Sequence, residues 1–272
     1  RISGPAIVNT PDEAGFDLNQ DPGVPYLYNI SFCGAQIGFD RKQAGKEGPG
    51  SLGHSGNELE GMKIAGNTFD YPFIHGKAIQ AAGKYSFVSC SDEAVENGII
   101  SLEDYPIVDY ILGLEKESPT DKAYYKTFSS PMQRAITSYC QSGGNLFVSG
   151  AYVGSDMSGT QGNREFTEKI LKYGFQGSLT DQTSGQINGL SRTITIPRQP
   201  NEKSYAVSSP DCIVPLSPAF PVFVYAPGNQ SAGIAYKGDY RTFVLGFPFE
   251  SIQSETDRAS IMMGILNFFT QK

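Results

Sequence analysis

The chain has 272 residues, of which 39% are hydrophobic and 18% charged, and its formal net charge is -7. This hydrophobic fraction excludes a disordered chain, and the length suffices for one large domain or two small ones with a real core. The negative charge argues against a nucleic acid or an anionic membrane as partner, because phosphate binding needs a basic surface. No apolar run in the sequence is long enough to span a bilayer, so we expect no membrane insertion.

The start of the sequence suggests a module of a longer protein. The sequence begins Arg1-Ile-Ser-Gly-Pro5 without a signal-peptide pattern. We interpret residues 1–272 as a single domain from a longer multidomain protein, with any export signal outside it. The four cysteines show no C-x-x-C spacing and are too few for a disulfide scaffold, so we expect small buried side chains. They are Cys33, Cys90, Cys140 and Cys212. A bond between Cys33 and Cys90, at adjacent predicted strand ends, is left open.

The first third of the chain contains few clear elements. A strand is predicted over residues 24–32 and a helix near residues 73–82. Between them lies a long Gly-rich insertion, residues 33–70. A connection of this length inside a compact domain is usually functional or a local cap.

The middle of the chain alternates between strand and helix patterns. Residues 84–90 are rich in β-formers, and residues 105–113 are nearly all apolar, as in a parallel strand covered on both faces. Ser130 as N-cap, followed by Pro131, predicts the start of a helix that ends at Gly143-Gly144. A strand over 145–150 and a helix over about 163–173 follow. This order predicts right-handed crossovers and a parallel sheet.

The last third begins with a change of character. Residues 177–228 contain short β-like pieces and prolines without a helix pattern, which predicts an antiparallel β extension at the sheet edge. Strands are then predicted over 233–237 and 241–247. Ser254 is expected to cap a terminal helix, with Asp257 in the first turn where the helix dipole favours a carboxylate.

Three stretches together resemble a bacterial family often labelled xanthan lyase. They are residues 55–72 (Ser-Gly-Asn-Glu-Leu-Glu-Gly to Gly-Asn-Thr-Phe-Asp-Tyr-Pro), residues 143–156 and residues 245–250 (Leu-Gly-Phe-Pro-Phe-Glu). In that family a class I glutamine amidotransferase-like domain sits beside fibronectin type III and golvesin-type modules. The resemblance implies a three-layer, mostly parallel, flavodoxin-like sheet. It also implies an extracytoplasmic location and a role in envelope or polysaccharide processing, with a carbohydrate or neighbouring modules as partner. Xanthan lyase activity itself is not expected, because true xanthan lyases are similar to α-helical toroids with a β-sandwich.

The glutaminase machinery of that fold is missing. Its nucleophile stands in a G-x-C-x-G turn, and the matching stretch Gly150-Ala-Tyr-Val-Gly154 places Tyr152 at that position. A tyrosine hydroxyl, with an ordinary pKa of about 10, is a poor acyl acceptor at neutral pH. The partner histidine of the family comes after this turn, whereas His54 and His75 both precede it. We therefore expect neither glutaminase activity nor a hydrolase triad with a late histidine.

Polar residues are predicted at the carboxyl ends of the strands, where open parallel sheets bind ligands. Several carboxylates and hydroxyls at one rim would bind a sugar. The expected ligand-binding residues are Ser91, Asp92, Glu93, Tyr152, Ser155, Asp156 and Glu250, together with His54 and Glu58 from the Gly-rich insertion. Alternatively, Asp92 and Asp156 simply cap the helices that follow them.

Two further patterns concern catalysis and metals. If the rim is catalytic, His54, Asp92 and Glu250 are the acid–base candidates, whereas His75 lies in an apolar helical pattern typical of a structural residue. The run Asp17-Leu-Asn19-Gln-Asp21 opens like a calcium loop, but Pro22 and Tyr28 occupy the positions that need Gly and Glu. No cofactor is predicted, and calcium is retained only as an alternative.

The sequence thus supports three functional hypotheses. The first is a non-catalytic or weakly catalytic accessory domain that binds a glycan or a partner module at the rim. The second is a hydrolase or lyase acting on a polysaccharide or cell-wall fragment. The third is a structural spacer between modules.

Overall fold

The computed structural model describes residues 6–7, 63–64, 71–116, 126–179, 184–198 and 206–271. The chain divides into two units: residues 1–70, 118–124 and 197–206 form the first, and residues 71–117, 125–196 and 207–272 the second. In the first unit, β1 (Ala6–Ile7) pairs antiparallel with β2 (Lys63–Ile64). Several predicted features lie outside the described residues: the strand over 24–32, the insertion over 33–70 apart from β2, and the side chains of Asp17, Asn19, Asp21, Cys33, His54 and Glu58.

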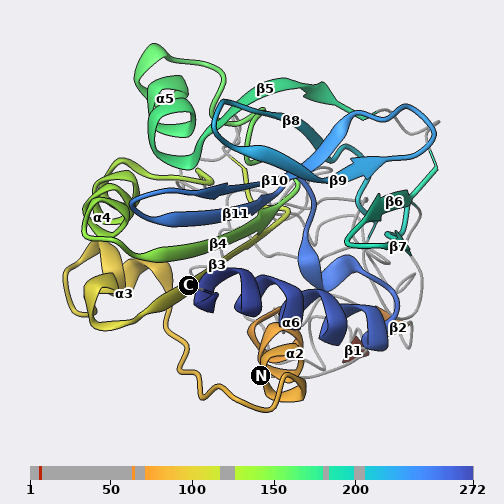
Figure 1. Cartoon of the computed structure of the whole chain (residues 1–272), viewed down its shortest axis with the longest axis horizontal. Coiled ribbons are helices and arrows are strands. Elements are labelled where there is room, and N and C mark those ends of the chain that lie inside the picture. Colours follow the sequence, from red (N-terminus) through yellow and green to blue (C-terminus); the bar gives the residue numbers. More distant parts are fainter. Residues whose placement is uncertain are drawn as a thin grey trace, which may run out of the picture. The chain divides into compact units, whose positions relative to one another are not determined.

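The second unit is built on a mixed seven-stranded sheet with the order β3-β4-β11-β10-β9-β6-β7 (Figure 1). Its strands are β3 (Ile107–Gly113), β4 (Asn145–Gly150), β6 (Gln186–Gly189), β7 (Arg192–Thr195), β9 (Phe220–Tyr225), β10 (Ser231–Lys237) and β11 (Arg241–Leu245). The β3–β4 and β4–β11 pairs are parallel, and the other four neighbouring pairs are antiparallel. A separate antiparallel pair joins β5 (Tyr173–Ser178) to β8 (Asp211–Pro215).

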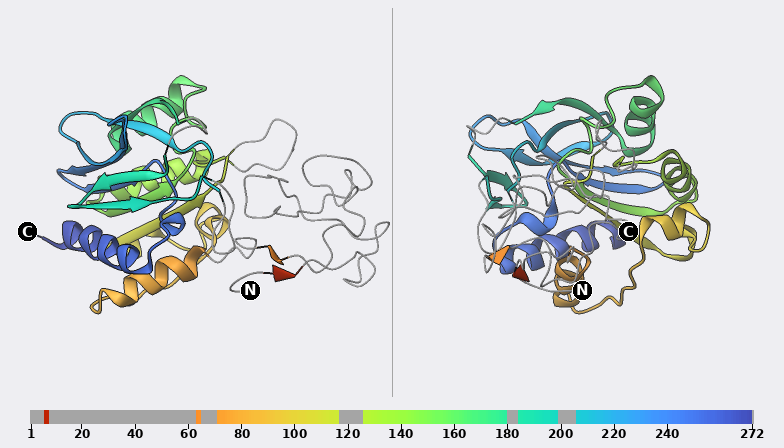
Figure 2. Two further views of the ribbon diagram at one scale, coloured as in Figure 1. Left: turned by 90° about the vertical axis from the view of Figure 1, so that its right-hand side faces the viewer. Right: turned by 180° about the vertical axis from the view of Figure 1, so that it is seen from behind.

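Helices cover both faces of this sheet. They are α2 (Tyr71–Ala81), α3 (Asp92–Glu96), α4 (Ser130–Gln141), α5 (Gln161–Phe166) with a π-helical continuation (Thr167–Leu171), and α6 (Glu255–Thr270), with the 3-10 turns η2 (Leu102–Asp104) and η4 (Phe249–Ser251). Figures 1 and 2 show α2 and α6 on one side of the strands and α4 with α5 on the other.

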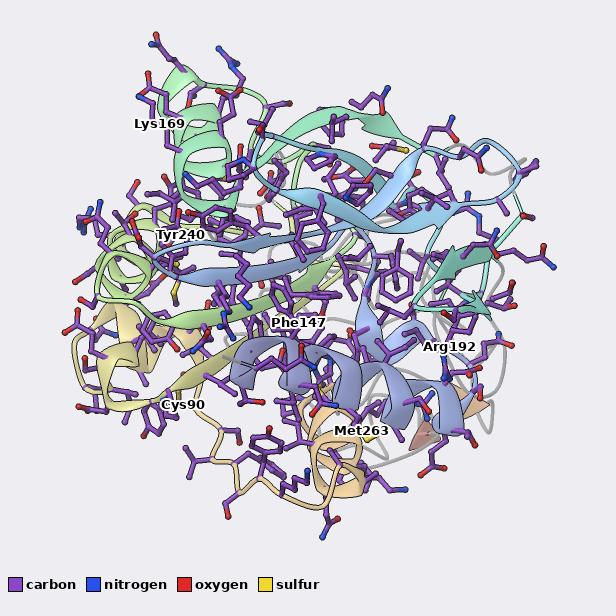
Figure 3. The ribbon with its side chains drawn as sticks, viewed as in Figure 1. Cys90, Phe147, Lys169, Arg192, Tyr240 and Met263 are labelled. Carbon is purple, nitrogen blue, oxygen red and sulfur yellow. The ribbon has the colours of Figure 1, made fainter. Side chains whose placement is uncertain are left out.

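The side chains of β4 explain this layering, because alternate residues of a strand point to opposite faces. Leu146 and Val148 join the core that also contains Ile136 of α4. Phe147 lies between the sheet and α6 (Figure 3), with its ring centroid 5.9 Å from that of Phe249. The side chains of β4 therefore pack into a hydrophobic core on each face of the sheet.

The mixed sheet corrects one expectation. The α/β class and the antiparallel character of residues 177–228 are confirmed, since the strands in this stretch, β6, β7, β8 and β9, all pair antiparallel with their described neighbours. The mostly parallel, flavodoxin-like three-layer arrangement is not confirmed. The connection between β10 and β11 spans only residues 238–240, and a parallel crossover needs a dozen residues or more, so this pair must be a hairpin.

Local predictions succeed with small shifts and one failure. The N-cap of α4 is Ser129 rather than Ser130, with the Ser129 side chain accepting from Met132 N at 3.2 Å. Proline is tolerated throughout the first helical turn, so Pro131 does not fix the register. The strand predicted over 84–90 is not formed in this structure, because these residues belong to no helix or strand. Cys140 and Cys212 are buried as expected, whereas Cys90 is exposed, and all three are free thiols.

Candidate functional site

The parallel strands β3 and β4 end at the same edge of the sheet, and polar residues follow both. Glu115 and Lys116 follow β3 after one intervening residue, and the turn over 151–157, here called the elbow, follows β4. Helix α3 begins at Asp92, close enough to act electrostatically on Glu115. Five carboxylates form an acidic cluster at this edge: Asp92, Glu93, Glu96, Glu115 and Asp156.

Glu115 is the most perturbed member of the acidic cluster. Burial, together with the charges of Asp92, Asp156, Glu93 and Glu96, raises its pKa to about 8. Burial and the neighbouring Glu93 raise the pKa of Asp92 to about 6. In contrast, a hydrogen bond from Ser91 lowers the pKa of Glu93 below its usual range. At neutral pH, Glu115 is therefore a neutral hydrogen-bond donor beside ionised acceptors.

Glu115 was not among the residues selected from the sequence. The available signal was its position two residues after an apolar run, where the strand-end rule places ligand contacts. Asp92, Glu93 and Asp156, which the sequence predicted, share the cluster with it. Glu250 is not among the carboxylates that act on Glu115.

The elbow contains Tyr152, the central residue of the Gly-Ala-Tyr-Val-Gly stretch over 150–154. The side chain is buried, with 6% of its surface exposed, and Lys116 Nζ lies 4.4 Å from its ring centroid. A cation over the ring face is attracted by the ring quadrupole, so this contact joins the residues after β3 to those after β4. Tyr152 therefore packs into this edge of the sheet, and little of its side chain is accessible to a ligand.

Asp156 attaches the elbow to the segment before α4. Its Oδ2 accepts hydrogen bonds from Thr127 N at 2.9 Å and from Thr127 Oγ1 at 2.8 Å, and Lys126 lies 3.8 Å from Oδ1. The cap of α5 is instead Thr160, which accepts from Asn163 N. Asp92 lies inside α3, whose N-cap is Ser91. The helix-cap interpretation of Asp92 and Asp156 is therefore wrong.

A buried carboxylate, Asp211 of β8, occupies the inner side of the elbow. Its Oδ2 accepts from Gly154 N (2.8 Å), Ser155 N (2.7 Å) and Ser155 Oγ (3.0 Å), and its Oδ1 accepts from Ser178 Oγ (2.7 Å). Burial raises its pKa to about 6, although these hydrogen bonds partly oppose the shift. Paired backbone N–H groups at such a turn are the usual stabilisers of an oxyanion, and here they bind an internal carboxylate. No local pattern in the sequence marks Asp211.

Glu250 lies in a second polar group, between the sheet and α2. His75 Nδ1 lies 2.7 Å from Asp109 Oδ2, and His75 Nε2 lies 3.3 Å from Glu250 Oε2. The histidine is 1% exposed, and its ring packs edge-on against Phe249 at 4.7 Å. Burial disfavours the charged imidazole, but the two carboxylates outweigh that effect and raise the pKa of His75 to about 9. The sequence-based interpretation of His75 as structural agrees with this burial and pairing.

Two features of the described residues bear on metals and membranes. Within those residues, no three His, Cys, Asp or Glu side chains are grouped so as to hold a metal ion. None of the described helices combines the length and the apolar character that crossing a membrane requires.

No protein-family model matches the chain, and no curated protein matches it. Solved structures with detectable similarity include a GH42 β-galactosidase from G. stearothermophilus (TM-score 0.45, 10% identity, 75% of this chain and 27% of that chain). An exo-β-1,4-mannosidase from Opitutaceae bacterium strain TAV5 gives a TM-score of 0.46 at 8% identity, over 75% of this chain and 31% of that chain. The N-terminal domain of mmIFT52 gives 0.46 at 14% identity, over 71% and 88%.

The matches span less than a third of either glycosidase. At TM-scores below 0.5 these likenesses establish neither a common fold nor a common activity. None of the three proteins is a xanthan lyase or a glutamine amidotransferase.

Proposed function

We propose that the second unit is a non-catalytic accessory domain that binds a glycan at the acidic cluster. Its parent would be an exported bacterial protein of envelope or polysaccharide processing. What supports this proposal is the placement of Glu115 among four other carboxylates, which together with burial raise its pKa to about 8. Sugar hydroxyls both donate and accept hydrogen bonds, so they need one donor among acceptors, which the acidic cluster supplies at neutral pH.

The charge of the cluster favours some glycans over others. Its ionised carboxylates, in a chain of net charge -7, repel uronates and pyruvylated sugars. Neutral sugars and amino sugars suffer no such repulsion. We therefore propose a neutral or amino-sugar glycan as the ligand.

The groups that catalysis would need at the elbow are engaged in the fold, which supports a non-catalytic role. Tyr152 stands where a nucleophilic cysteine would be, and its ring is covered by Lys116. The N–H groups of Gly154 and Ser155 point to Asp211. His75, the histidine among the described residues, is buried between two carboxylates.

One observation favours the second candidate, a glycan hydrolase or lyase. Within the acidic cluster, the pKa of Glu115 is raised to about 8, whereas that of Glu93 is lowered. Two carboxyl groups with pKa values moved in opposite directions are the usual acid and base of glycan cleavage. In this alternative, Glu115 would be the acid, in place of His54, Asp92 or Glu250.

A binding and turnover experiment on the full chain separates the candidates. Neutral, amino-sugar and uronate-containing glycans are arrayed at pH 7 and pH 9, and the same polysaccharides are assayed for released products. We expect wild-type binding to neutral or amino-sugar glycans at pH 7 to fall about tenfold at pH 9, because Glu115 loses its proton. Glu115→Gln keeps a donor and should bind equally at both pH values. Glu168→Gln, a change at an exposed glutamate, serves as the control.

Each outcome is decisive. Product release that Glu115→Gln abolishes would make the protein an enzyme. Binding with the same pH dependence in wild type and Glu115→Gln would remove Glu115 from the site. Absence of both binding and product release would leave the structural spacer as the function.

A further inference from the structure

Strand β3 has the sequence of a central strand but lies at the end of the described sheet. Its residues, Ile107–Gly113, are nearly all apolar, yet the first five are only half-buried. Its neighbour β4 is buried from its second residue onward. Among the described strands, β4 pairs with one side of β3 and none pairs with the other. An open edge of this kind is a template for a further strand.

A candidate for this further strand lies just before β3 in the chain. Residues 84–90, here called the strap, are rich in β-formers but make no backbone hydrogen bond with another described residue. Phe87 is 51% exposed and Val88 is 72% exposed. The strap ends at Cys90, next to α3 (Figure 3). Among the described residues, the strap thus lacks a backbone partner, and β3 lacks one along its outer edge.

The side chains of the strap already alternate as in a strand. Tyr85 Oη lies 3.4 Å from Thr270 Oγ1 of α6, and the Phe87 ring packs at Gly76 of α2, where a Cβ would come within 2.4 Å of it. Both residues therefore contact the layer of α2 and α6. The same layer covers β3, since His75 of α2 contacts Asp109. Val88 and Cys90 have the opposite parity and would face the side of α4.

We propose that the strap closes onto the outer edge of β3 as an eighth strand, parallel to it. The connection over residues 91–106 contains α3 and η2, which is long enough for a right-handed crossover. Closure covers Val88 and the half-buried residues of β3. It also fixes Ser91 and Asp92 at the carboxyl edge, beside Glu115. The closure does not depend on glycan binding, so either proposal can fail without the other.

Amide hydrogen exchange on the full chain, with two matched proline variants, tests the closure. In a docked strand, successive N–H groups point alternately toward β3 and away from it, and proline is tolerated only where the N–H points away. Ser86 and Ser89 have opposite parity. In a docked strand their N–H groups would therefore point to opposite sides. We expect one of Ser86→Pro and Ser89→Pro to speed exchange at residues 107–111 at least tenfold, and the other to leave it unchanged.

Equal effects of the two variants would overturn the proposal. If both leave β3 protected, another segment covers the edge; if both release it, the strap acts through its side chains and not as a strand. The wild-type protein gives a test that needs no variant. Alternate amides over residues 85–90 must be protected at least tenfold, and uniformly fast exchange there would also overturn the closure.

Discussion

His75 shows how a buried charge is retained at the residue scale. The side chain is almost fully enclosed, which costs several kcal/mol for an isolated ion, but carboxylates lie at both ring nitrogens. The three residues come from α2, β3 and η4, so the group joins a helix to two separate parts of the sheet layer. Removing the cation would leave two carboxylates in an apolar region beside Phe249.

We expect His75→Gln to lower the free energy of unfolding at pH 7 by about 3–5 kcal/mol, the usual cost of breaking a buried pair. Because the pKa is raised from 6.5 to about 9, the stabilisation is complete below pH 6.5 and is lost as the pH rises through 9. The gap between the variant and wild type should therefore narrow above pH 9. Urea unfolding at several pH values measures this difference in the free energy of unfolding. Lys77→Gln, at an exposed ion pair on the same helix, should change stability by less than about 0.5 kcal/mol.

Helix α4 shows how much one capping residue decides at the element scale. Two serines precede Pro131, but only Ser129 has the extended backbone of an N-cap, with φ -61° and ψ 158°. Its hydroxyl accepts from Met132 N and also donates to Glu96, a member of the acidic cluster. The start of α4 and the candidate site are therefore linked through one side chain.

Ser129→Ala should lower the free energy of unfolding by about 1–2 kcal/mol, because an N-cap bond is lost. Ser130→Ala, one residue further along and inside the helix, should be neutral or slightly stabilising, since alanine has the higher helix propensity. Thermal unfolding of the two variants followed by circular dichroism compares them directly. A larger loss for Ser130→Ala would place the cap where the sequence alone suggested it.

At the scale of the whole molecule, groups with raised pKa values make stability fall as the pH rises, and among the described carboxyl and imidazole groups His75 and Glu115 have the largest values. The stabilisation by His75 is lost through pH 9. The pKa of Glu115 is raised from 4.5 to about 8, so the folded protein binds more protons than the unfolded chain between these values. By linkage, the free energy of unfolding decreases as the pH rises through that window.

We expect the wild-type protein to be most stable at mildly acidic pH and to lose stability between about pH 5 and 9. Glu115→Gln should remove roughly 1–3 kcal/mol of the loss between pH 4.5 and 8, since one pKa unit corresponds to about 1.4 kcal/mol. The effect above pH 8 that belongs to His75 should remain. A series of urea titrations from pH 4.5 to 10 provides the test. Parallel pH profiles for the two proteins would contradict the assignment of the raised pKa to Glu115.

The sequence by itself determined what depends on near neighbours in the chain. The apolar runs of β3 and β4 and the caps of α4 and α6 to within one residue follow from patterns only a few residues long. The antiparallel character of residues 177–228 is confirmed for the same reason, since short strands separated by turn residues pair with close neighbours.

The tertiary structure alone decided what depends on residues far apart in sequence. Strand order, the pairing of β10 with β11, the occupation of the elbow by Asp211 and the pairing of Glu250 with His75 involve contacts that no local pattern encodes. The strand predicted over 84–90 is absent because strand pairing is a property of two segments, and the described backbone of this one is unpaired. The raised pKa of Glu115 has the same origin, since it results from burial and from four carboxylates that are far from Glu115 in the sequence.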